Sequence, residues 1–168
     1  ILEAIATGEN HQLTVEKPGP IAPQDMPGYL QTEDAYPFRC DGSFSIVRPA
    51  GKRGLSPHAY PRVGPLFGYQ CHNKKIYSGL TRVAWELNEV GPDDEATTFV
   101  PGSHKANFPT PGHLLEHGSP IMQSYTCPEG SLIVFTEALT HAGGEWRNPD
   151  FSRIAILHAY GPILAQYH

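Results

Sequence analysis

The residues best suited to chemistry lie in the C-terminal third of the sequence, at the ends of two apolar segments. Residues 130–141 read as a glycine turn, a buried strand and then His141, and Arg153 follows twelve residues later, just before the apolar run 154–157. A neutral imidazole binds transition metals, and an arginine binds a carboxylate through two parallel hydrogen bonds. A metal ligand and a carboxylate clamp on neighbouring strands indicate iron chemistry with an organic acid as co-substrate.

The elements that must position these residues are short strands. The chain contains 17 Gly and 17 Pro, and so many turn residues favour strands joined by turns over long helices. Apolar and β-branched runs predict strands over residues 44–47, 77–90, 97–100, 121–125, 131–136 and 153–160. Many short strands with long loops at one rim indicate a mainly β fold, a sandwich or small barrel.

The length of 168 residues suits a single domain, 1–168. We expect residues 1–43 to be a proline-rich segment that wraps the surface and residues 44–162 to form the β core. The first residue is Ile1 rather than Met, so we expect that an N-terminal piece can be missing. The sequence leaves targeting and oligomeric state open.

Composition narrows the class of protein. The net charge of −5 argues against non-specific nucleic-acid binding, and no apolar run approaches the about 18 residues of a membrane span. Hydrophobic residues make up 39% of the chain and charged residues 17%, which is typical of a globular protein. Cys40, Cys71 and Cys127 have no zinc-site spacing, so we expect unpaired thiols in a reducing compartment and a cytoplasmic location.

Several motifs resemble one enzyme family. Residues 85–90 (WELNEV), 91–94 (GPDD) and 99–105 (FVPGSHK) resemble the central signature of the phytanoyl-CoA dioxygenase family, and 130–141 with Arg153 resembles its second signature. The similarity covers residues 44–162. It implies a double-stranded β-helix, the jelly-roll or cupin-like fold, with long loops and few helices. It also implies an Fe(II) centre with 2-oxoglutarate as co-substrate.

The resemblance also implies an activity and the residues that carry it. Such an enzyme uses O2 to hydroxylate a small organic substrate, decarboxylates 2-oxoglutarate to succinate, and can use ascorbate as reductant. Two histidines and a carboxylate hold the iron, with no catalytic groups separate from these ligands. The distal histidine maps onto His141, and the arginine that binds the far carboxylate of 2-oxoglutarate maps onto Arg153. Tyr69 and Gln70, which precede an inner strand, are expected to line the co-substrate pocket.

The first iron ligand is less clear from the sequence, because the chain contains no His-x-Asp or His-x-Glu motif. His58 and His72 both precede the strand that contains Trp85. We favour His58, because the order strand, turn, histidine, loop, strand fits the family better. The position two residues after His58 holds Tyr60, and the position two residues after His72 holds Lys74.

Several groups could therefore be the third iron ligand. Glu137 lies four residues before His141 and on the same strand face if the strand stays regular. Tyr60 could ligate instead, or an anion could fill the position, as in related iron halogenases. If nothing fills it, the chain is a metal-deficient, non-catalytic β-helix binding protein. Arg153 has an alternative reading too, a surface ion pair with one of the acidic residues Asp93, Asp94 and Glu129.

Overall fold

A computed structural model describes residues 38–59, 68–72, 75–106 and 108–162 of the chain. Strands dominate these parts, and the helices there are two short 3-10 turns, η3 (Ser103–Lys105) and η4 (Gly112–Leu114). The strands in chain order are β1 (Phe38–Arg48), β2 (Gln70–His72), β3 (Lys75–Tyr77), β4 (Thr81–Glu86), β5 (Thr97–Phe99), β6 (Leu132–Thr136), β7 (His141–Gly143) and β8 (Arg153–Pro162).

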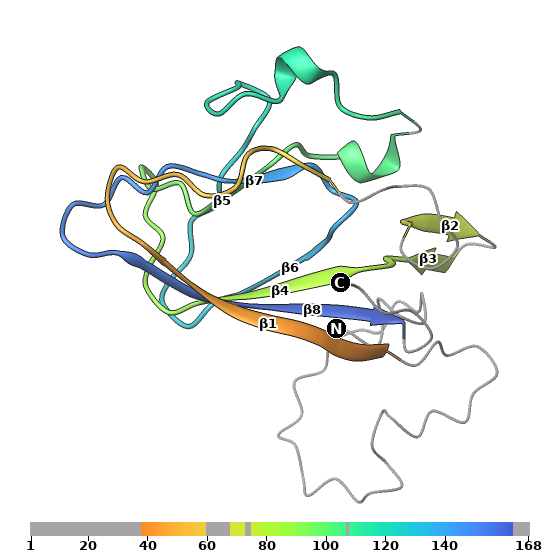
Figure 1. Cartoon of the computed structure of the whole chain (residues 1–168), viewed down its shortest axis with the longest axis horizontal. Helices are drawn as coiled ribbons and strands as arrows, with labels where there is room; N and C mark the ends of the chain where they lie inside the picture. The colour runs from red at the N-terminus through yellow and green to blue at the C-terminus, as the bar shows by residue number, and fades with distance from the viewer. Residues whose placement is uncertain (1–37, 60–67, 73–74, 107, 163–168) are drawn as a thin grey trace, which may run out of the picture.

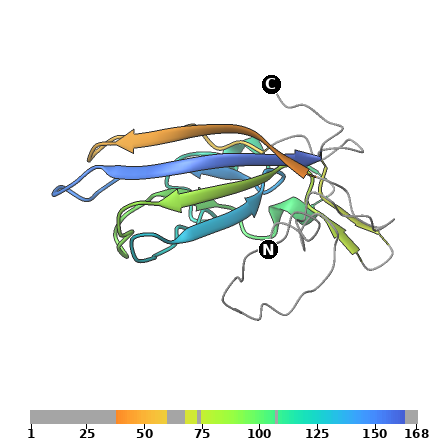
Figure 2. The ribbon, with the colours of Figure 1, turned by 90° about the horizontal axis from the view of Figure 1, so that it is seen from below.

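The largest sheet has four antiparallel strands in the order β1-β8-β4-β6, which Figure 2 shows side by side. Side chains alternate between its two faces. Along β8, the buried residues Arg153, Ala155, Leu157 and Ala159 alternate with more exposed ones, as expected of a strand with one inward face. On β4, Ala84 and Glu86 are buried on that inward face.

A second, smaller layer faces this sheet (Figure 1). Its centre is the antiparallel pair β5 and β7, in which Phe99 lies opposite His141. Isolated β-bridges extend this layer on both sides. His58 pairs with His141 of β7, and Gln123 pairs with Phe99 of β5. Two antiparallel layers, with strands far apart in sequence lying side by side, give a barrel-like sandwich.

The core is divided between two apolar clusters. Ala84, Ala155 and Leu157 pack on the inward face of the four-stranded sheet, with Ile46 and Ile133 against them. The second cluster consists of Val90, Ala96 and Trp146, with Tyr125 and Cys127 packed on it.

The strands predicted from the sequence are largely present, but the one expected over 77–90 is shorter (β4), and β2, β3 and β7 were not expected. Two other segments also differ. The strand expected at 44–47 is longer and begins at Phe38. The expected strand at 121–125 is wrong: this segment makes one bridge, at Gln123, and otherwise runs as turns and loop. The proline-rich part up to residue 37 and Tyr60 lie outside the described residues. Within the described ranges, helices are too short to cross a bilayer.

Candidate metal centre

Three of the residues singled out from the sequence come together between the two layers. His58, Glu137 and His141 each offer a ligand atom, and these atoms lie within 4.8 Å of one another. The backbones of His58 and His141 are paired directly, with N–H to carbonyl distances of 2.9 and 2.8 Å. Their ring centroids are 4.3 Å apart. The cluster joins the loop after β1, the end of β6 and the start of β7.

Both imidazole rings are oriented by their own backbone. Nδ1 of His58 lies 2.7 Å from the carbonyl oxygen of Ser56, and Nδ1 of His141 lies 2.7 Å from that of Leu139. A carbonyl oxygen can only accept, so Nδ1 is the protonated nitrogen in each ring. Nε2 of each ring then carries the free lone pair. A hydrogen bond from the other ring nitrogen to a backbone carbonyl is typical of metal-binding histidines.

Glu137 is held in place from two sides. Its N–H donates to the carbonyl of Leu80 at 2.8 Å, which fixes the backbone just beyond β6. Its Oε1 accepts a hydrogen bond from Nε of Arg82, while Oε2 lies 3.8 Å from Nε2 of His141. The carboxylate is 4% exposed, so a buried anion faces two imidazole lone pairs. A cation between them would complete this arrangement.

The electrostatic environment keeps His141 ready to bind a metal. Burial lowers the pKa of His141, and this outweighs the opposing effect of the Glu137 carboxylate. The ring is therefore neutral at physiological pH, which is the form that ligates. The rings of Phe135 and Phe99 pack around it, with centroids at 5.0 and 6.5 Å. His58 is exposed, so the cluster is walled on the His141 side and open on the His58 side.

The other sequence-predicted residues lie elsewhere. Tyr69 packs edge to face on His104, with centroids 4.7 Å apart, and Gln70 is the exposed first residue of β2. His72 ends β2, and His58 belongs to the cluster. Their predicted pocket roles remain predictions.

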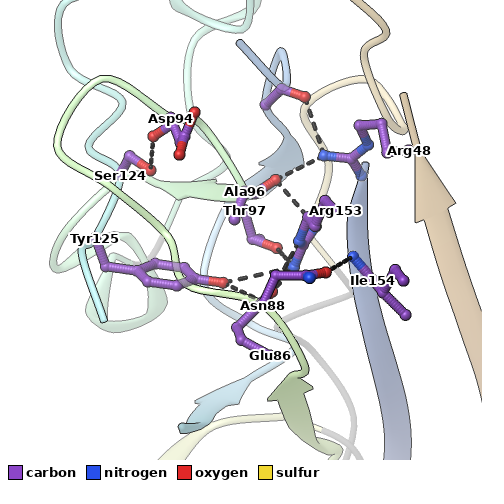
Figure 3. A network of polar contacts seen from close by, with 11 residues as sticks. Arg48, Glu86, Asn88, Asp94, Ala96, Thr97, Ser124, Tyr125, Arg153 and Ile154 are labelled. Carbon is purple, nitrogen blue, oxygen red and sulfur yellow. Dashed lines mark hydrogen bonds and ion pairs between the residues drawn. The ribbon is translucent and has the colours of Figure 1, made fainter. Parts of the chain in front are cut away.

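Arg153 lies inside the protein, and its ion pair is with Glu86 and not with Asp93, Asp94 or Glu129. Its side chain is 0% exposed and forms a two-pronged ion pair with Glu86, whose side chain is also 0% exposed. Nη1 donates to the carbonyl of Ala96 at 3.1 Å and Nη2 to Oγ1 of Thr97 at 3.2 Å. The hydroxyl of Tyr125 donates to Glu86 at 2.6 Å. Figure 3 shows this network, which the sequence reading missed.

A second arginine adds to the charge of this network. Arg48 is buried and donates to the carbonyls of Ala96 and Gly144. Burial, reinforced by the nearby Arg153, lowers the pKa of Arg48 to about 10. Burial also favours lowering the pKa of Arg153, but the hydrogen bonds and charge of Glu86 and the contact with Tyr125 outweigh it and raise that pKa. Burial raises the pKa of Tyr125, so its hydroxyl stays a donor.

The sequence did carry a signal for Glu86 and Arg82. On a strand, residues four apart share a face, and Ala84 between them belongs to the core. Two ionisable residues on an inward face must each have a partner. Arg82 forms an ion pair with Glu137, and Glu86 forms one with Arg153.

Comparison with known proteins identifies the fold. No family model and no curated protein sequence matches the chain. Solved structures do match: HygX from Streptomyces hygroscopicus with nickel and 2-oxoglutarate bound is 21% identical, with a TM-score of 0.64 over 77% of this chain and 58% of that one. AviO1 from Streptomyces viridochromogenes Tue57 is 18% identical, with a TM-score of 0.57 over 78% and 54%. The mainly β, cupin-like fold is confirmed.

A third match extends the set. SnoN, a non-haem α-ketoglutarate-dependent epimerase from nogalamycin biosynthesis, is 17% identical, with a TM-score of 0.52 over 74% of this chain and 49% of SnoN. HygX has also been solved with iron bound, and with nickel, 2-oxoglutarate and hygromycin B. The chain spans less than two thirds of the length of each of these structures. At these identities the likeness describes the fold of the chain.

Proposed function

We propose that the chain is a non-haem Fe(II) and 2-oxoglutarate-dependent oxygenase that hydroxylates a small organic substrate. The observation that carries the proposal is the cluster of His58, Glu137 and His141. Two imidazoles and one carboxylate are the donor set typical of such iron sites. The matched structures with iron and 2-oxoglutarate bound support the same reaction type. Membership of the phytanoyl-CoA dioxygenase family is part of the proposal.

The residues present fit Fe(II). Nε2 of His58 and His141 would bind it together with Oε2 of Glu137, because each of these atoms is already oriented by a neighbouring group. When bound, iron and 2-oxoglutarate supply the activation of O2 for attack on an unreactive C–H bond. Phe99 and Phe135 exclude water from the His141 side. The open His58 side is where a small substrate would enter.

Glu137 favours this proposal over the alternative functions. A halogenase requires the carboxylate position to be vacant for a halide, and here Glu137 approaches both histidines. A metal-deficient binding protein has no need for two imidazoles whose Nε2 atoms converge on a buried carboxylate oxygen, since Arg82 binds Oε1 of Glu137 and leaves Oε2 to the histidines.

The test is metal binding by anaerobically purified protein. We expect one equivalent of Fe(II) per chain, a visible charge-transfer band when 2-oxoglutarate is added, and slow succinate formation in air. Glu137→Ala should lose the iron, whereas Glu129→Ala, which removes an exposed carboxylate, should retain it. Wild-type protein that binds no iron would support the binding-protein reading. Full iron binding by Glu137→Ala, with chloride-dependent spectra, would support the halogenase reading.

A further inference from the structure

A co-substrate with two carboxylates needs a cation for the carboxylate that does not reach the metal. A buried carboxylate without a partner is costly, and an arginine fork is the usual partner. The resemblance assigns this role to Arg153. The contacts of Arg153 are not compatible with it.

All three nitrogens of the Arg153 guanidinium already bind groups of the protein. Nε and Nη2 bind the two carboxylate oxygens of Glu86, Nη1 donates to the carbonyl of Ala96, and Nη2 also contacts the hydroxyls of Thr97 and Tyr125. A second carboxylate would have to displace Glu86 and leave that side chain buried without its partner. Like charges at one buried site repel strongly, and breaking a buried ion pair is costly. Glu86 therefore occupies the place of the carboxylate that Arg153 was predicted to bind.

Arg82 is the arginine next to the metal cluster. It projects from β4 on the same face as Ala84 and Glu86, and its Nε donates to the candidate ligand Glu137. Arg82 and Glu86 lie four residues apart on one strand, about 13 Å at 3.3 Å per residue. The two arginine–glutamate pairs are therefore at opposite ends of β4.

The terminal fork of Arg82 is available. Within the described ranges, the hydrogen bond of the Arg82 side chain is made by Nε, to Glu137. Nη1 and Nη2 make none there. The guanidinium carbon lies 5.5 Å from the ring centre of Phe44, and Phe44 is 47% exposed. The Arg82 side chain is 14% exposed. The fork thus lies between a metal cluster and a partly open aromatic surface, where a ligand can reach it.

The other described arginines are committed elsewhere. Arg39, Arg53 and Arg147 form ion pairs with Asp41, Glu145 and Glu95, and Arg48 binds backbone carbonyls. None of these pairs includes a member of the metal cluster. Among the described arginines, Arg82 is the one that contacts it.

We propose that Arg82, and not Arg153, binds the distal carboxylate of the 2-oxo diacid. The proposal rests on the proposed function, because it presupposes that a 2-oxo acid binds at the cluster. Arg82 then has two tasks: its Nε orients Glu137, and its fork receives the co-substrate. Arg153 remains a structural residue, locked to Glu86.

The test compares two keto acids on protein loaded with Ni(II), using calorimetry under conditions without turnover. 2-Oxoglutarate has the distal carboxylate, and 2-oxopentanoate has the same keto-acid end without it. Arg82→Met should weaken binding of 2-oxoglutarate about 10- to 100-fold more than binding of 2-oxopentanoate, the range for a lost hydrogen bond to a charged group, because any effect through Glu137 weakens both keto acids alike. The control Arg147→Met removes an exposed arginine that is paired with Glu95 and should change neither. Unchanged 2-oxoglutarate affinity in Arg82→Met would overturn the proposal and return the role to Arg153.

A second variant separates co-substrate binding from the orientation of Glu137. Arg82→Lys keeps a positive charge beside Glu137 but lacks the fork, so Ni(II) should still bind while 2-oxoglutarate weakens about tenfold. Equal weakening of both keto acids would mean that Arg82 acts only through Glu137, and would overturn the clamp role. If wild-type protein binds neither Ni(II) nor 2-oxopentanoate, the proposed function fails instead, which is a different result from either of these.

Discussion

His58 and His141 are joined directly through their backbones, each N–H donating to the carbonyl of the other residue. The two imidazoles therefore do not depend on a flexible loop for their relative position. The same ladder continues away from the cluster, where the N–H of Gly54 donates to the carbonyl of Gly143 at 3.0 Å. The spacing of the two segments at Gly54 and Gly143 thus sets how His58 approaches His141.

Gly143→Ala should disturb this ladder. A Cβ on Gly143 would overlap Cα of Gly54 and lie 2.8 Å from a guanidinium nitrogen of Arg48, so the segments must move apart. We expect a loss of about 1–3 kcal/mol in the free energy of unfolding, measured by chemical denaturation, and weaker Ni(II) binding. Gly42→Ala is the matched control, because a Cβ there meets nothing within 4 Å. Equal stability of the two variants would contradict this account of the ladder.

The buried network around Glu86 predicts a larger effect. Glu86→Ala would leave Arg153 and the neighbouring Arg48 without an anion inside the protein. Removing one partner of a buried ion pair costs about 3–5 kcal/mol, which should appear as a lower urea midpoint. Glu145→Ala removes the partner of the largely exposed Arg53 and should cost no more than about 1 kcal/mol. Similar losses in the two variants would show that Glu86 is not buried with its charge.

Tyr125→Phe tests the third member of the same network. The Tyr125 hydroxyl donates to Glu86 at 2.6 Å, and its raised pKa keeps it a donor across the physiological range. Losing a hydrogen bond to a charged group should destabilise the fold by about 1.5–3 kcal/mol. Tyr160→Phe serves as the control, because its hydroxyl makes no hydrogen bond to a described residue, and should change stability by less than about 0.5 kcal/mol.

The sequence predicts the strands around β4, β6 and β8 from their apolar and β-branched residues. The inward face of β4 includes Arg82 and Glu86, so its orientation does not follow from the apolar pattern alone. The strand predicted at 121–125 is wrong, because apolar content does not reveal whether a neighbouring strand is present to pair with. In the structure the segment meets β5 only at Gln123.

The individual residues of the candidate site could be predicted from the sequence, but which of them come together in space could not. Glu137 and His141 are close in sequence, so their shared face could be inferred, whereas His58 joins them only through a bridge across 83 positions. Arg153 was noticed as a cation entering a buried strand. Its partner Glu86 lies 67 residues away, and no local pattern connects them. Long-range pairs of this kind depend on the order and pairing of the strands, which the local pattern of a single sequence does not reveal.

Metal binding should also stabilise the fold, which provides a test independent of any substrate. The buried Glu137 carboxylate and the neutral His141 ring face each other, so a divalent cation that binds only the folded state shifts the unfolding equilibrium. At a hundredfold excess over Kd the gain is about 2.7 kcal/mol. Ni(II) should therefore raise Tm in wild-type protein and a chelator should reverse the rise. His141→Ala should lose the Ni(II)-dependent rise, whereas His113→Ala, an exposed residue in η4, should keep it. A rise that persists in His141→Ala would place the metal at another site.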